Sequence, residues 1–155
     1  MAVKRAKKKT SPRKTPAKKA KAAPTKGLSM SSASPSFTVG DIQKSLAWYK
    51  DVLGFRVEER WEKDGKLAGV MVQAGDVRFM LGQDDWMKGR DRRKGEGFRL
   101  YCETKQDVDA LAKKIQAKGG TLDQEPHDEP WGTRDFSLTD PDGFKLTIAR
   151  EVKKR

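Results

Sequence analysis

The sequence contains one cysteine, one histidine and no long hydrophobic run. A single cysteine, Cys102, excludes an internal disulfide framework and a zinc site built from thiolates. Nothing nearby in the sequence lowers its pKa, so we expect a buried structural thiol rather than a nucleophile. No apolar stretch approaches the ~20 residues needed to span a bilayer, and no hydrophobic segment follows the basic start. We therefore expect a soluble, cytoplasmic protein without a membrane partner.

The positive charge of the chain is concentrated at its N-terminus. The net charge is +12 over 155 residues, but residues 1–27 contain eleven Lys and Arg and no Asp or Glu. The remaining 23 basic residues (34 less 11) are matched by 22 acidic residues, so the rest of the chain is almost neutral.

Residues 1–35 are rich in Lys, Pro and Ala and have few large apolar side chains, which predicts a disordered tail. The tail resembles those of linker histones, and it predicts non-specific, salt-sensitive binding to nucleic acid. A solubilising extension or an import signal would explain the same composition. The residues expected to contact phosphates are Lys7, Lys8, Lys9, Arg13, Lys14, Lys18 and Lys19.

The body of the chain repeats one order of elements. Asp41 precedes helically spaced apolar residues that end at Gly54, and Asp107 precedes a similar run that ends at Gly120, 13 positions later in each case. A strand is expected before each helix and three extended stretches after it. The sequence therefore predicts two β-α-β-β-β units of an α+β protein, with helices on the convex side of a curved mixed sheet.

A tight turn divides the last two strands. Asp140-Pro141-Asp142-Gly143 has turn chemistry, because Pro presets φ, Asp bonds its own backbone and Gly accepts positive φ. Apolar residues alternate with polar ones on both sides of this turn, which predicts a hairpin with one buried face.

Two segments carry a family resemblance. Residues 41–55, which begin Asp-Ile-Gln-Lys-Ser-Leu, resemble the first helix of the vicinal oxygen chelate superfamily, which includes glyoxalases, bleomycin-resistance proteins, fosfomycin-resistance enzymes and dioxygenases. Residues 130–136 and the turn at 140–143 are similar to the signature of its second module. The resemblance implies one domain over 36–151, with modules at 36–82 and 97–151 and a linking loop at 83–96.

The same resemblance bears on a metal cofactor. Enzymes of this family hold a divalent metal with His, Gln or Glu from four strand positions, which correspond here to Ser34, Met80, Arg99 and Thr147. These four side chains do not supply a ligand set for Zn²⁺ or Fe²⁺. We therefore predict no metal and no other cofactor. The only histidine, His127, falls in a polar run at 125–129, where we expect an exposed loop residue rather than a ligand.

Strand parity predicts which residues line the concave face, which in this family forms the ligand cavity. The basic side chains of this face outnumber its acidic one, which favours a small anionic ligand. Alternatively, these charges face solvent or pair with one another, as on any sheet with one face in solvent. Trp131 is the tryptophan most expected to touch a ligand, and Trp86 is a candidate for a subunit interface. The predicted ligand-binding residues are Ser36, Thr38, Arg78, Met80, Arg99, Tyr101, Glu103, Trp131, Lys145 and Thr147.

These observations favour a metal-free, homodimeric binding protein that sequesters or senses a small molecule. One alternative is a metal-dependent lyase, transferase or dioxygenase of the same fold. The other is a nucleoid- or chromatin-associated protein that acts through its tail. We predict no catalytic residue, since no arrangement of nucleophile and base emerges from the sequence.

Overall fold

The computed structural model describes residues 27, 28 and 30–152. Contacts divide the chain into residues 1–32 and residues 33–155. The described residues of the first unit, 27, 28 and 30–32, form no helix or strand. Most of the predicted tail, residues 1–35, lies outside the described part of the chain, which includes only residues 27, 28 and 30–35 of it. The seven residues predicted to contact phosphates, from Lys7 to Lys19, also lie outside the described part.

The first module forms around a short helix that is capped as predicted. Its elements are β1 (Ser36–Val39), α1 (Ile42–Ala47), η1 (Trp48–Val52), β2 (Arg56–Lys63), β3 (Lys66–Ala74) and β4 (Val77–Gln83). The Asp41 side chain accepts hydrogen bonds from the amides of Gln43 and Lys44, which starts α1. The helix widens into the π-helix η1 at Trp48, and Gly54 follows with a φ of 80°.

The second module repeats this order. Its elements are β5 (Arg99–Glu103), α2 (Val108–Ala117), β6 (Gln124–Asp128), β7 (Thr133–Thr139) and β8 (Lys145–Glu151). Asp107 caps α2 by accepting from the Ala110 amide at 3.0 Å. The predicted turn at 140–143 joins β7 to β8.

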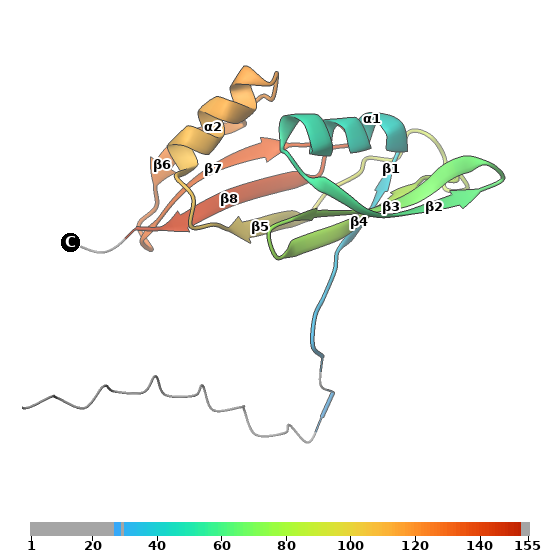
Figure 1. Cartoon of the computed structure of the whole chain (residues 1–155), viewed down its shortest axis with the longest axis horizontal. Coiled ribbons are helices and arrows are strands. Elements are labelled where there is room, and N and C mark those ends of the chain that lie inside the picture. Colours follow the sequence, from blue (N-terminus) through green and yellow to red (C-terminus); the bar gives the residue numbers. More distant parts are fainter. Residues whose placement is uncertain (1–26, 29, 153–155) are drawn as a thin grey trace, which may run out of the picture. The chain divides into compact units, whose positions relative to one another are not determined.

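Hydrogen bonds organise the strands into two four-stranded mixed sheets, β1-β4-β3-β2 and β5-β8-β7-β6. The α+β class and the two tandem modules are confirmed, but the sheet is divided and not continuous. Each module completes its own ladder, because β1 pairs with β4 and β5 pairs with β8, both in parallel. Figure 1 shows α1 and α2 on the same side of the two sheets.

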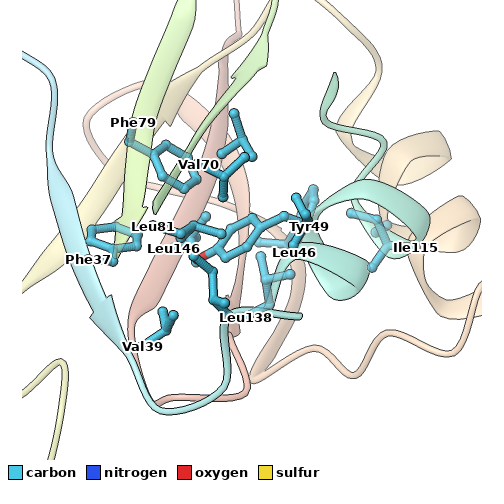
Figure 2. Close-up of a cluster of buried hydrophobic side chains, with 14 of the residues drawn as sticks. Phe37, Val39, Leu46, Tyr49, Val70, Phe79, Leu81, Ile115, Leu138 and Leu146 are labelled. Atoms are coloured by element: carbon cyan, nitrogen blue, oxygen red, sulfur yellow. The ribbon is translucent and has the colours of Figure 1, made fainter. Parts of the chain in front are cut away.

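One hydrophobic core lies between the helices and both sheets. Figure 2 shows Phe37 and Phe79 of the first sheet, Leu138 of the second, and Tyr49 and Ile115 of the helices converging on this core. Complete burial of a Leu or Phe side chain contributes about 1.5–3 kcal/mol. The two modules are therefore held together by shared apolar burial.

The turn after β7 also binds the first module directly. One Asp142 carboxylate oxygen accepts from the Gly40 amide at 2.6 Å, and the other accepts from Ser45 Oγ at 2.7 Å. These bonds fix the N-terminal end of α1 against the β7–β8 turn.

No helix in the described residues is long and apolar enough to cross a membrane.

Candidate functional site

The face of the two sheets opposite α1 and α2, here called the open face, carries the residues that strand parity selects. In β1, Phe37 and Val39 are buried in the core while Ser36 and Thr38 are exposed. In β5, Arg99, Tyr101 and Glu103 are exposed and alternate with partly buried residues. The predicted alternation is therefore present in these strands.

Strand register arranges the predicted residues of the second sheet in rows. Arg99 pairs with Lys145, and Tyr101 pairs with Thr147 across the β5–β8 ladder. Glu103 pairs with Ala149, which is followed in the same row by Asp135 of β7. Because paired residues share a face of a sheet, the open face has a basic row at one end and an acidic row at the other.

Arg99 and Lys145 form the basic row. Arg99 Nη1 donates a hydrogen bond of 3.0 Å to Thr147 Oγ1, whose residue is only 6% exposed. Neither Arg99 nor Lys145 forms an ion pair with a carboxylate of the described residues. Two adjacent cations without carboxylate partners attract an anion, and guanidinium recognises carboxylate or phosphate through paired hydrogen bonds.

An open depression of about 400 Å³ lies beside this basic row. Lys94 is largely buried in its wall and pairs with the buried Asp84, so its charge is already matched. Arg99 and Lys145 then outweigh Glu96, which leaves a net positive lining suited to a small anion. The lining residues are Lys94, Gly95, Glu96, Gly97, Phe98, Arg99, Gly143 and Lys145.

The predicted residues of the first sheet lie in a different setting. Ser36 pairs with Met80, and Thr38 pairs with Gly82. Arg78 lies 3.6 Å from the Glu58 carboxylate and forms an ion pair with it. Arg78 thus follows the alternative in which open-face charges pair with one another, in contrast to Arg99 and Lys145.

Trp61 is an open-face residue that is absent from the predicted ligand-binding set. It pairs with Gly69 on β3, and a Cβ at Gly69 would lie 3.0 Å from the Trp61 ring. Gly69 pairs with Gly82, where a Cβ would meet nothing within 4 Å. The ring therefore lies over glycine backbone beside open space. The alternation of side chains along its strand could have predicted that Trp61 lies on the open face.

The two tryptophans with predicted contacts, Trp131 and Trp86, lie in contrasting environments. Trp131 is 64% exposed in the turn between β6 and β7. Trp86 packs on Gly40, and the Arg90 guanidinium lies 4.8 Å above its ring. Trp86 thus seats the linking loop on the first module, and its expected role at a subunit interface remains a prediction.

The expectation that His127 lies in a loop is wrong. His127 belongs to β6 and pairs with Asp135 of β7. The proline and the acidic residues of this segment are unfavourable in a strand, so the sequence did not predict one here. Pro126 is nevertheless tolerated, because β6 is an edge strand and the register of its ladder shifts near this residue. His127 Nε2 is 3.0 Å from Glu129 Oε1, so the histidine belongs to the acidic end of the open face.

Cys102 lies on β5 and is partly buried. Burial raises the pKa of its thiol above the ordinary value, which disfavours the thiolate. This environment agrees with a structural cysteine and gives no support for a nucleophile.

Comparison with known proteins identifies the family to which this arrangement belongs. The Glyoxalase/Bleomycin resistance protein/Dioxygenase superfamily matches residues 32–148, and the chain is a member of it. A probable lactoylglutathione lyase from Synechocystis sp. is 28% identical over 123 residues, covering 76% of this chain and 92% of the relative. Glutathione transferase FosA from Serratia marcescens is 24% identical over 115 residues, covering 73% and 75% respectively.

A crystal structure of a glyoxalase/bleomycin resistance protein/dioxygenase from Nocardioides has the same fold. Its TM-score is 0.66 at 15% identity, and the match covers 84% of this chain and 89% of the other.

The residues at the family's four metal-ligating positions do not fit a divalent metal. Arg99 is cationic and donates a hydrogen bond to Thr147 Oγ1, so two of these positions are joined by a donor and a hydroxyl. Met80 offers a thioether, and Ser34 is exposed in the segment before β1. Hard and borderline metals require carboxylate, imidazole or thiolate ligands, and these four positions supply none.

Proposed function

We propose that this protein binds a small anionic molecule on the open face of its second sheet, with Arg99 and Lys145 supplying the positive charge. The observation that supports this proposal best is the adjacent pair of cations, which have no carboxylate partners in the described residues and lie beside a depression of about 400 Å³. Thr147 orients the Arg99 guanidinium, and Tyr101 and Phe98 offer exposed aromatic surface nearby.

The chemistry of the two relatives suggests a ligand class. Both are named for glutathione or a glutathione conjugate, which carries two carboxylates at neutral pH. A carboxylate held bidentately by Arg99, with a second anionic group near Lys145, would satisfy the charges of the basic row. We therefore take glutathione and S-lactoylglutathione as the first probes, with benzoate and inorganic phosphate as smaller anions.

The test compares two arginines of the same face. Isothermal titration with each probe would be carried out on the wild type, Arg99→Met and Arg78→Met. Arg99→Met should weaken binding by about 10-fold or more, as expected for loss of a charged hydrogen bond of about 1.5–3 kcal/mol. Arg78→Met should leave affinity nearly unchanged, because Arg78 is already paired with Glu58. Equal effects of the two substitutions would contradict the proposed site.

The names of the relatives also favour a second candidate, a metal-dependent enzyme that acts on glutathione conjugates. The residues at Ser34, Met80, Arg99 and Thr147 argue against it. Formation or cleavage of S-lactoylglutathione, assayed with and without added Ni²⁺ or Zn²⁺, separates the two candidates. Metal-dependent turnover that survives His127→Asn would show a metal-dependent enzyme that does not use His127, and it would overturn the proposal of a binding protein.

We further propose that the chain works in the cytoplasm as a homodimer, and that the basic residues 1–27 add non-specific affinity for nucleic acid. The eleven cationic residues of this segment, with no acidic residue among them, support the second statement. Sedimentation equilibrium of the full chain tests the dimer, because a monomer mass at all concentrations would exclude it.

A further inference from the structure

The acidic end of the open face brings together three side chains that the anion site does not use. His127 on β6 lies opposite Asp135 on β7, and Glu129 follows two residues after His127. One ring nitrogen or carboxylate oxygen from each residue lies within 4.8 Å of the others. Three potential metal ligands therefore converge at the outer edge of the second sheet.

Asp135 is a buried carboxylate without a cationic partner among the described lysines and arginines. It is 4% exposed, and none of the ion pairs of the described residues includes it. Thr133 Oγ1 donates a hydrogen bond to its carboxylate at 3.3 Å. Burial of a charge is costly unless a counter-charge or several hydrogen bonds compensate for it.

The His127 ring is held in an orientation that directs Nε2 toward the two acids. Nδ1 lies 3.0 Å from the Glu125 carbonyl oxygen, which can only accept, so Nδ1 carries a proton. Nε2 lies 3.0 Å from Glu129 Oε1, which can only accept, so a protonated Nε2 donates to this carboxylate and a bound metal ion would take the place of that proton. Donation from the other ring nitrogen to a backbone carbonyl is the usual support of a metal-bound histidine.

We propose that His127 Nε2 and the carboxylates of Glu129 and Asp135 bind one divalent transition-metal ion of the Zn²⁺, Co²⁺ or Ni²⁺ type. One imidazole nitrogen and two carboxylate oxygens are suitable ligands for these ions. The site is built from β6, β7 and the turn between them, and it shares no residue with the four strand positions or with the basic row.

The burial and strand pairing of the ligands suit this role. Metal–ligand distances of about 2.0–2.2 Å require the three donors to approach more closely than 4.8 Å. The Glu129 side chain is 20% exposed and that of His127 33%, so both are accessible from solvent and can adjust. The register of the β6–β7 ladder shifts between Gln124 and His127, which interrupts the regular pairing of the edge strand β6. An ion bound by residues of both strands would add a further link between β6 and β7.

The experiment benefits from the presence of a single histidine in the chain. Untagged full-length protein would be titrated with Zn²⁺ by calorimetry and with Co²⁺ by visible absorption. The expected result is one ion per chain and a higher unfolding temperature with Zn²⁺. His127→Asn and Asp135→Asn should each weaken Zn²⁺ binding by more than about 100-fold, the upper end of the effect of losing an outer-shell partner.

Glu125→Gln is the matched control, because this exposed acid also lies on β6 but contacts Gln116 and can keep that bond as glutamine. It should retain wild-type Zn²⁺ affinity. Far-ultraviolet circular dichroism checks the fold of each variant, and Asp135→Asn should fold at least as stably as the metal-free wild type because it removes a buried charge.

Two outcomes would overturn the proposal. One is the absence of saturable binding at millimolar Zn²⁺, which would indicate that a proton on His127 balances the acids. The other is unchanged affinity in the folded His127→Asn variant. Arg99→Met should keep full Zn²⁺ affinity, so failure of the metal site and failure of the proposed anion site are distinguishable.

Discussion

Tyr49 Oη donates a buried hydrogen bond of 2.8 Å to Asp140 Oδ2, which joins η1 of the first module to the turn after β7 in the second. Burial raises the pKa of Asp140 above its ordinary value. Burial also raises the pKa of Tyr49, and the neighbouring Asp140 carboxylate adds to this shift. The bond therefore places a polar contact between the modules within an otherwise apolar core.

Replacement of Tyr49 by Phe should lower the free energy of unfolding by about 1–3 kcal/mol, because it leaves the buried Asp140 oxygen without this donor. Urea unfolding measures the change, and the denaturant dependence should stay constant. Tyr101→Phe is the control, since Tyr101 is exposed on β5 and should change stability by less than about 0.5 kcal/mol. Equal losses in the two variants would contradict this assignment.

Asp84 should contribute to a loss of stability in acid. Hydrogen bonds from Lys94, the Trp86 amide and Arg92 hold the pKa of this carboxyl well below its usual range. A group with a lowered folded-state pKa contributes stability above its unfolded pKa, about 3.9, and loses it as the pH falls further.

Asp84→Asn should therefore flatten the fall in the urea midpoint below about pH 4, whereas Asp91→Asn, in the exposed part of the same loop, should leave it unchanged. Parallel pH profiles for wild type and Asp84→Asn would show that another carboxylate causes the acid sensitivity.

Gly95 and Gly97 offer a matched test of the close contact between the linking loop and the β7–β8 turn. Both have positive φ, at 73° and 68°, so alanine carries a backbone penalty of about 1–2 kcal/mol at either position. A Cβ at Gly95 would also collide with the Gly143 backbone, whereas one at Gly97 would meet nothing within 4 Å.

Gly95→Ala should therefore lower the unfolding temperature more than Gly97→Ala, and it should also weaken anion binding because both contacting glycines line the depression. Thermal unfolding and calorimetry measure the two effects. If Gly95→Ala and Gly97→Ala differ in unfolding temperature but not in anion affinity, the contact between the loop and the turn does not contribute to the ligand site.

The basic segment should govern binding to nucleic acid. Substitution of Lys7, Lys8, Lys9, Arg13, Lys14, Lys18 and Lys19 by Gln removes seven of the eleven cationic residues in 1–27. Affinity for duplex DNA should fall, and the slope of log K against log salt should become shallower by about 0.9 for each phosphate that is no longer neutralised. An unchanged slope would place DNA binding elsewhere, and anion binding by Arg99 serves as the internal control.

Several features of the fold were predictable from the sequence because they depend on neighbours along the chain. Asp41 and Asp107 cap their helices as predicted, and the turn at Asp140–Gly143 joins two strands. The two-residue period of β1 and β5 is sufficient to assign the open face. The boundary of β6 was not predictable in this way, because Pro126 and the acids around it lower strand propensity locally.

The candidate site was only partly predictable. The alternation of side chains along each strand placed Arg78, Arg99 and Lys145 on the same face as equivalent cations. This local pattern does not show which residues of other strands form ion pairs or hydrogen bonds with them. Glu58 pairs with Arg78, while Arg99 bonds to the Thr147 hydroxyl. These contacts depend on register between segments that are distant in sequence, so the local pattern could not distinguish the three residues.

The sequence alone thus determined the repeated module, the α+β class and the face on which polar side chains lie, since local periodicity and turn chemistry set these features. The tertiary structure decided that the strands form two sheets, that Arg99 and Lys145 lack carboxylate partners in the described residues, and that His127 lies beside Asp135. The physical reason is that charge matching and ligand convergence depend on cross-strand register, which long-range packing selects.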